Sequence, residues 1–135
     1  MDLKKLRVSG RRLQSTLEEM AKIGGTAGGG VQRLTLTDED RQARDIFVKW
    51  LREIDCEVTV DEMGNIFGRR HGQNNALPPV MSGSHIDSQP KGGRFDGILG
   101  VMGAMGELRT LHVIKDQTER PMVIEDWTNE EGSRF

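Results

Sequence analysis

The spacing of hydrophobic residues along the chain predicts three helices. Residues 9–23 carry apolar side chains at helical intervals, with Ser9 as a candidate N-cap and Gly24-Gly25 as a stop. Residues 38–54 show the clearest stripe, formed by Ala43, Ile46, Phe47, Trp50, Leu51 and Ile54. Thr37 precedes this stripe as N-cap, and Asp40 follows three residues on as an acidic variant of the capping box.

The third helical pattern, over residues 98–110, is rich in glycine. Its apolar positions are Ile98, Val101, Met102, Met105 and Leu108, while glycine recurs at every third position from Gly97 to Gly106. Glycine costs roughly 0.8–1 kcal/mol per position in a helix interior. We therefore expect this helix to pack closely against a sheet.

Shorter segments between the helices are typical of strands. Residues 57–61 alternate polar and apolar side chains and predict a half-buried strand, which a Met63-Gly64 turn joins to a partner over 65–70. Residues 80–84 and 121–127 are short apolar runs and predict two buried strands. The alternation of strand and helix predicts an α/β fold with helices packed on a mixed sheet.

Composition narrows the possible partners and setting. The 135 residues are 30% charged with a net charge of −2, which argues against a nucleic acid or an acidic membrane surface as partner. Cys56 is the only cysteine, so no disulfide framework exists and a cytoplasmic setting is favoured. Neither a signal peptide nor a membrane-spanning run is evident.

The loop from Gly83 to Gly97 concentrates side chains that bind metals. His85 and Asp87 lie two residues apart, an arrangement that suits a metal-ligating imidazole oriented by a carboxylate. Asp96 comes just before the third helix, and the glycines around it allow the loop to fold back toward His85. The loop follows one predicted strand, at the end where open α/β sheets place their sites.

A second acidic pair, Glu130-Glu131, follows the last predicted strand. On extended backbone the two side chains point to opposite faces, so we expect them to have different tasks. One can bind a metal, and the other can act as a general base toward water. Mixed imidazole and carboxylate ligands are compatible with zinc, manganese, cobalt or nickel.

Each of these residues also has a purely structural explanation. A histidine after a strand is more often hydrogen-bonded than metal-ligating, Asp96 could cap the next helix, and Glu130-Glu131 could be a solvated pair. In combination and in this chain order, a metal-dependent hydrolytic site is the better interpretation. The remaining candidates are assigned to packing or surface roles: Cys56 and Trp50 to the interior, His71 and His112 to the surface, and Trp127 to the last strand with a possible role as a site wall.

Three motifs resemble those of the N-carbamoyl-L-amino-acid hydrolases, allantoate amidohydrolases and β-ureidopropionases, within the dinuclear-metal aminoacylase and carboxypeptidase superfamily. They are Gly83-Ser84-His85-Ile86-Asp87-Ser88, Gly92-Gly93-Arg94-Phe95-Asp96-Gly97 and Trp127-Thr128-Asn129-Glu130-Glu131-Gly132. Residues 29–37 are similar to the same group. The resemblance implies a metallopeptidase-like catalytic domain that hydrolyses a linear C–N amide bond in a small ureido substrate.

The resemblance also implies roles for individual residues. His85 binds one divalent metal ion, Glu131 binds a second, and Asp96 bridges the two. Glu130 is the general base, and Asp87 orients His85. The two ions would be zinc, manganese, cobalt or nickel.

The length of the chain departs from the family, whose members are several times longer and homodimeric. Residues 1–135 are therefore expected to be an incomplete N-terminal portion of the catalytic domain, without the dimerisation domain and two further histidine ligands. We expect such a portion to be inactive and to bind metal weakly. The alternatives are a non-catalytic binding or assembly fragment and a related amidase acting on acyl or peptidyl bonds.

Overall fold

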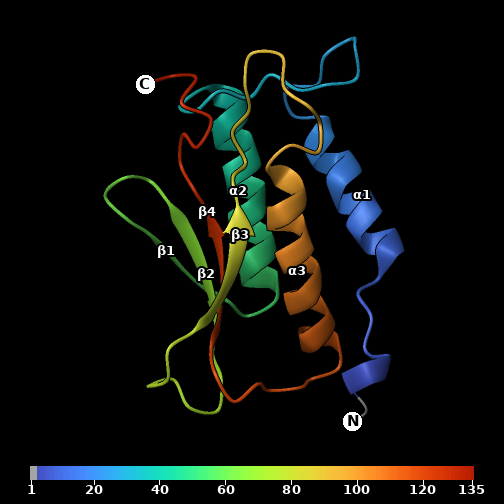
Figure 1. Cartoon of the computed structure of the whole chain (residues 1–135), viewed down its shortest axis with the longest axis vertical. Coiled ribbons are helices and arrows are strands. Elements are labelled where there is room, and N and C mark those ends of the chain that lie inside the picture. The colour runs from blue at the N-terminus through green and yellow to red at the C-terminus, as the bar shows by residue number, and fades with distance from the viewer. Residues whose placement is uncertain (1–2) are drawn as a thin grey trace.

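A mixed four-stranded sheet with helices packed on it forms the computed structural model, which describes residues 3–135 (Figure 1). The helices are α1 (Gly10–Ala21), α2 (Asp38–Glu53) and α3 (Ile98–Val113), preceded by the short 3-10 helix η1 (Leu3–Lys5). The strands are β1 (Glu57–Val60), β2 (Ile66–Arg70), β3 (Val80–Ser84) and β4 (Met122–Asp126). The predicted α/β class and all seven predicted elements are confirmed.

The order of strands across the sheet is β1-β2-β4-β3. The β1–β2 and β2–β4 pairs are antiparallel, whereas β3 and β4 run parallel and are connected through α3. In the parallel pair Ser84 lies opposite Asp126, so both strands end at the same edge of the sheet. The loops after β3 and β4 meet beyond this edge, at the top of Figure 1.

The two predicted N-caps are confirmed. The Ser9 hydroxyl accepts a hydrogen bond from the Arg12 N–H at 3.3 Å, and Thr37 accepts one from the Asp40 N–H at 3.3 Å. The capping box is a variant, because the Asp40 carboxylate accepts from the N–H of Leu36, at 3.0 Å, and not from that of the cap residue. Leu36 adopts a positive φ of 61°, which turns its N–H toward the helix.

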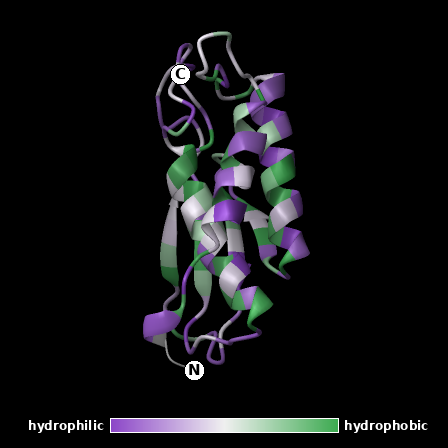
Figure 2. Cartoon of the chain, turned by 90° about the vertical axis from the view of Figure 1, so that its right-hand side faces the viewer, coloured by the Kyte–Doolittle hydropathy of each residue, from purple (hydrophilic) through white to green (hydrophobic). Residues whose placement is uncertain are grey.

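One hydrophobic core joins the three helices to the sheet. Its buried members include Leu17 and Met20 of α1, Phe47 and Leu51 of α2, Met102 and Met105 of α3, and Ile66 and Ile124 of the strands. Apolar and polar residues alternate along α1 and α2, as expected of helices with one face on a core, whereas α3 is apolar and glycine-rich over most of its length (Figure 2). Trp50 belongs to this core, as predicted.

The glycines of α3 are only partly explained by packing on the sheet. A Cβ on Gly100 would lie 2.7 Å from the Cβ of Ser84, so this glycine does allow α3 to approach β3. A Cβ on Gly106 would instead meet Val8 at 2.8 Å, outside the sheet. Gly103 has no atom within 4 Å of such a Cβ, and nothing in the structure explains it.

The predicted burial of two strands is wrong. In β3, Val80 and Met81 are 51% and 49% exposed, and in β1 only Val58 is partly buried. Both are edge strands of the described sheet, so each lacks a neighbour on one side. Trp127 follows the end of β4 and does not continue it; the indole is 40% exposed and packs edge-to-face on Phe67 at 5.9 Å.

Cys56 is a packed thiol, as expected from its place after α2. It is buried in the core, and this burial raises the pKa of the thiol to about 11. We expect the native protein at pH 8 to react with a thiol-specific disulfide reagent far more slowly than the chain in urea, because the thiolate is both scarce and inaccessible. Equal rates in the two conditions, followed by absorbance, would contradict this assignment.

Among residues 3–135, no helix has the length and apolar character needed to cross a membrane.

Candidate metal centre

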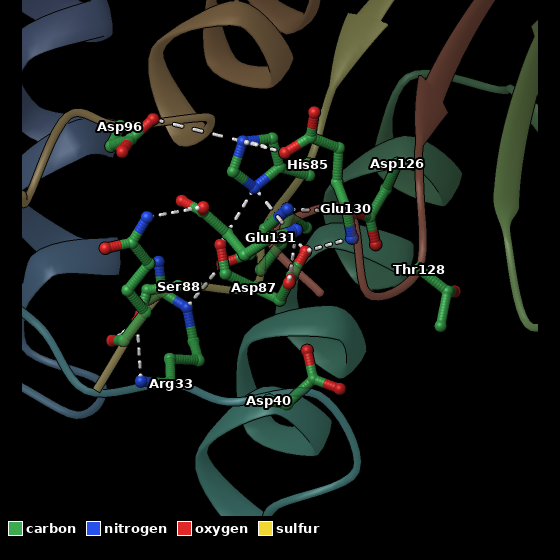
Figure 3. Close-up of polar contacts among 12 residues, drawn as sticks. Arg33, Asp40, His85, Asp87, Ser88, Asp96, Asp126, Thr128, Glu130 and Glu131 are labelled. Atoms are coloured by element: carbon green, nitrogen blue, oxygen red, sulfur yellow. Dashed lines mark hydrogen bonds and ion pairs between the residues drawn. The ribbon is translucent and has the colours of Figure 1, made fainter. Parts of the chain in front are cut away.

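Five polar residues meet where the loops after β3 and β4 come together. His85 and Asp87 come from the end of β3, Asp96 from the start of α3, and Glu130 and Glu131 from the turn after β4 (Figure 3). His85 and Asp87 are buried, while about half of the Asp96 and Glu130 side chains is exposed, at 55% and 53%. The five residues are therefore held on a buried base, formed by His85 and Asp87, and exposed to solvent at Asp96 and Glu130.

The His85 ring is oriented by its Nδ1 atom. This nitrogen lies 2.9 Å from the main-chain carbonyl oxygen of Asp87 and 3.4 Å from its carboxylate. Because a carbonyl oxygen can only accept, Nδ1 carries a proton. The other nitrogen, Nε2, consequently faces outward, 3.3 Å from Glu130 and 3.9 Å from Asp96.

The carboxylates around His85 stabilise its positive charge. The hydrogen bond to the Asp87 carboxylate is the main cause that raises the pKa of His85 to about 9, against the opposite effect of burial. Although burial opposes it, the contacts of Asp87 with His85 and with two backbone N–H groups lower the pKa of Asp87. With its pKa raised to about 9, the ring holds a proton on Nε2 near neutral pH, and a metal ion at Nε2 would have to displace it.

Asp87 also joins the two loops. Its two carboxylate oxygens accept the backbone N–H groups of Glu130 and Glu131, each at 3.3 Å. The predicted contact between Asp87 and His85 is present, and the same carboxylate holds the acidic pair of the second loop. One residue therefore sets the separation between His85 and both glutamates.

The backbone of Glu130 and Glu131 forms a turn, so the extended conformation assumed from the sequence is wrong. Asn129 adopts a positive φ of 56°, and the turn brings both side chains to the same group. Glu130 reaches Nε2 of His85, whereas Glu131 accepts a hydrogen bond from Gln89 at 2.9 Å. The two glutamates still differ in their partners.

Asp96 does not cap α3. The N-cap position is taken by Gly97, and no side chain bonds the first turn of the helix. Gly97 has a φ of +69°, and a Cβ there would lie 2.3 Å from Cε1 of His85. The His85 ring is therefore stacked on the bare backbone of Gly97, which leaves Asp96 directed at the histidine (Figure 3).

The donor atoms of His85, Asp96 and Glu131 fit a divalent cation. One ligand atom from each lies within 4.8 Å of the others. Tetrahedral ligands with bonds of ~2.1 Å are separated by about 3.4 Å, so the carboxylates of the exposed Asp96 and the half-buried Glu131 would move closer to close the set. An imidazole with two carboxylates matches zinc and the other first-row metals, whereas calcium and magnesium prefer oxygen alone.

Three further charged residues support this site and were missed from the sequence. Arg33 donates to the carbonyl of Ile86 at 2.9 Å, Asp126 accepts the N–H of Ile86 at 2.8 Å, and Arg44 pairs with Asp126 at 3.1 Å. Asp126 could have been found, because it shares the inward phase of β4 with Ile124. Arg33 carries no such signal, since its segment belongs to neither a helix nor a strand.

The other histidines lie elsewhere. His71 pairs with Glu57 at 3.0 Å and His112 lies 3.8 Å from Asp55, and both are partly exposed, as expected. Neither belongs to the His85, Asp96 and Glu131 group.

No protein-family model matches the chain. The known proteins and solved structures that are similar to it include amidases and related hydrolases. An N-carbamoyl-L-amino-acid amidohydrolase from Rhizobium meliloti is 46% identical over 129 residues. A ureidoglycolate hydrolase from Oryza sativa subsp. japonica is 34% identical over 123 residues, which are 91% of this chain and 25% of that protein. The crystal structure of a hydantoinase/carbamoylase family amidase from Burkholderia multivorans matches with a TM-score of 0.95 and 55% identity. In sequence and fold, the chain resembles the hydantoinase/carbamoylase family of amidases.

The resemblance extends over almost all of this chain but only part of its relatives. The match covers 96% of the chain, and 31% of the Rhizobium meliloti protein or 32% of the Burkholderia multivorans structure. The chain thus spans about a third of the length of these amidases. Its mixed sheet and helices are those of the corresponding part of the family fold.

Proposed function

We propose that this chain carries one half of the catalytic centre of an amidohydrolase that cleaves a linear C–N amide bond. The proposed substrate is a small N-carbamoyl-L-amino acid or a similar ureido compound, a class supported by the names of the relatives. The remaining ligands and the dimerisation surface would belong to regions that correspond to the other two thirds of those relatives. The observation that carries the proposal is the convergence of His85, Asp96, Glu130 and Glu131 above β3 and β4.

In this proposal His85, Asp96 and Glu131 would hold divalent metal, and Asp96 would contribute to both ions. When bound, zinc, manganese, cobalt or nickel would polarise the scissile carbonyl and lower the pKa of water. Asp87 holds the Nδ1 proton of His85, which leaves Nε2 as the donor atom. The buried Asp87 also keeps the acidic turn in register with the histidine.

Glu130 is proposed as the general base. Its carboxylate is half exposed and lies 3.3 Å from Nε2 of His85, so it borders the position of the metal and still reaches solvent. Glu130 would take a proton from the water that attacks the carbamoyl carbon, and return it to the departing nitrogen. Loss of ammonia and carbon dioxide then leaves the free amino acid.

The roles of the two glutamates are separated by metal titration of single variants. Zinc, manganese, cobalt and nickel are titrated into the 135-residue chain by calorimetry. We expect His85→Ala and Glu131→Gln to weaken binding at least about tenfold, since each removes a ligand, and Glu130→Gln to leave it nearly unchanged. The control His71→Ala removes an exposed histidine paired with Glu57 and should have no effect.

The reverse order, with Glu130→Gln losing metal and Glu131→Gln retaining it, would exchange the two assignments. Ammonia release from an N-carbamoyl amino acid is measured in the same samples. We expect no turnover by this chain, because three protein ligands do not complete a two-metal centre. Turnover abolished by Glu130→Gln would overturn the expected inactivity, and preference for an N-acetyl amino acid would indicate an acyl-amino-acid amidase.

A non-catalytic assembly role is the second candidate. The exposed apolar side chains of Val80 and Met81 on the free edge of β3 favour it, because uncharged edge strands invite pairing with another chain. Light scattering that shows concentration-dependent oligomers, together with no metal binding, would support this role. A monomer that binds metal would exclude it.

A further inference from the structure

The two peptide groups that flank Ile86 are each held by one buried ionisable side chain. The N–H of Ile86 donates to Oδ1 of Asp126 at 2.8 Å, and its carbonyl accepts from Nε of Arg33 at 2.9 Å. Ile86 is 0% exposed and stands between His85 and Asp87. The first peptide joins Ile86 to His85 and the second joins it to Asp87, so a rotation of either would redirect the side chain next to it.

Arg33 holds the carbonyl group of Ile86. Its side chain is 1% exposed, and Nη1 donates to the carbonyls of Met20 and Ile23 at 2.9 and 2.8 Å. The Arg33 main chain accepts from the N–H of Ser88, and its own N–H donates to the Ser88 hydroxyl, both at 2.8 Å. The His85 loop is thereby tied to the C-terminal end of α1.

Asp126 holds the N–H group of Ile86, and its contact with Arg44, which also contacts Thr128, leads to the second loop. Its Oδ2 pairs with Arg44 at 3.1 Å, and the same arginine nitrogen donates to Thr128 at 3.2 Å. Thr128 lies two residues before Glu130, and its N–H donates to Asn65 at 2.8 Å. The contacts of Asp126, Arg44 and Thr128 thus connect the loop that carries His85 with the turn that carries Glu130.

We propose that Arg33 and Asp126 are positioning residues that clamp the backbone on the two sides of Ile86, and so set the directions of His85 and Asp87. Buried charges often contribute less to stability than apolar side chains of similar volume. Two of them on adjacent peptide groups therefore point to a role in fixing the backbone conformation between His85 and Asp87. The inference rests on the proposed metal site for its function, and on the Ile86 contacts alone for its structure.

The test combines metal affinity with two signals from nuclear magnetic resonance on the 135-residue chain. The first signal is hydrogen exchange of the Ile86 amide, and the second is the Nδ1 proton of the His85 ring. Arg33→Met should weaken zinc binding about 10- to 100-fold and change the ring signal, as for other residues that orient a ligand. Arg33→Lys keeps the charge without the planar fork and should recover only part of the affinity.

Arg109→Met is the matched control. Arg109 is partly buried, donates to Thr16 at 2.7 Å and lies 5.0 Å from the Trp50 ring, and neither contact involves the His85 loop. The control should lose stability but keep zinc affinity within about twofold. An equal loss of affinity in both arginine variants, or none in Arg33→Met, would overturn the proposal.

A pair of variants at Asp126 tests the other side of the clamp, and decides the matter if Arg33→Met does not fold. Asp126→Asn keeps an acceptor for the Ile86 N–H and should retain slow exchange, whereas Asp126→Ala should exchange at least about tenfold faster, because the hydrogen bond is lost. Equal exchange in the two would refute the clamp. If the wild-type chain binds no metal, the proposed function fails, while the exchange and ring signals still test the clamp.

Discussion

Gly97→Ala is expected to displace the His85 ring and to lower the free energy of unfolding by about 2–5 kcal/mol. Gly97 adopts a φ of +69°, which alone costs an L-residue about 1–2 kcal/mol. The added Cβ would also lie 2.3 Å from Cε1 and 2.5 Å from both ring nitrogens of His85. The ring cannot stay in place, and its hydrogen bond to Asp87 is lost with it.

Urea unfolding and zinc calorimetry measure the two parts of this effect. Gly29→Ala is the control, since Gly29 has a φ of +83° but no atom within 4 Å of a new Cβ. It should cost only the backbone strain of about 1–2 kcal/mol and leave metal affinity unchanged. Similar losses in the two variants would show that backbone strain, and not contact with His85, is responsible.

Arg44→Met is expected to destabilise the fold by about 3–5 kcal/mol at pH 8. Asp126 is almost completely buried, and burial raises its pKa to about 7 although Arg44 opposes this effect. Without Arg44, the charged carboxylate loses its counter-ion, and its pKa rises further. The variant also loses the hydrogen bonds of Arg44 to Thr128 and to the carbonyl of Gly64.

The penalty should depend on pH in a defined direction. The pKa of Asp126 in the folded state lies above the value of about 3.9 expected in the unfolded chain, so its contribution to stability falls as pH rises from 4 to 7. In Arg44→Met the fall continues to higher pH. At pH 5 the carboxyl is protonated in both proteins, and only the lost hydrogen bonds remain, worth about 1–2 kcal/mol.

Urea unfolding of both proteins at pH 5 and pH 8 tests this expectation. In the background of Asp126→Asn, the Arg44→Met penalty should be the same at both pH values. Lys49→Met is a surface control on the same helix, because Lys49 and Glu53 form an exposed pair at 3.9 Å. A penalty in Arg44→Met that does not change between pH 5 and pH 8 would contradict the titration of Asp126 in this range.

The sequence predicted the helices and strands well because their signals are local. The stripe from Ala43 to Ile54 and the caps Ser9 and Thr37 depend on neighbours within one or two turns. Burial of a strand depends instead on what lies beside it in the sheet. Val80 and Met81 have the composition of an interior strand, and only the order β1-β2-β4-β3 reveals that β3 is an edge.

The candidate site was predicted in its composition but not in its geometry. His85 and Asp96 were named as ligands from the combination of motifs and the resemblance to an amidase family, and the structure places the two side chains 3.9 Å apart. The turn at Asn129 was not evident, because a positive φ at asparagine has no periodic signature. The clamp on Ile86 was equally hidden, since it joins residues 53 and 40 positions apart.

The strand order also constrains how the chain can acquire its structure during synthesis. β4, the last described strand, lies inside the sheet between β2 and β3. Until it leaves the ribosome, the β1–β2 hairpin and the β3–α3 unit have no common strand to pair with. Closure of the sheet and joining of the two loops through Asp87 therefore both wait for β4, and the nascent chain must keep β2 and β3 from other partners until then.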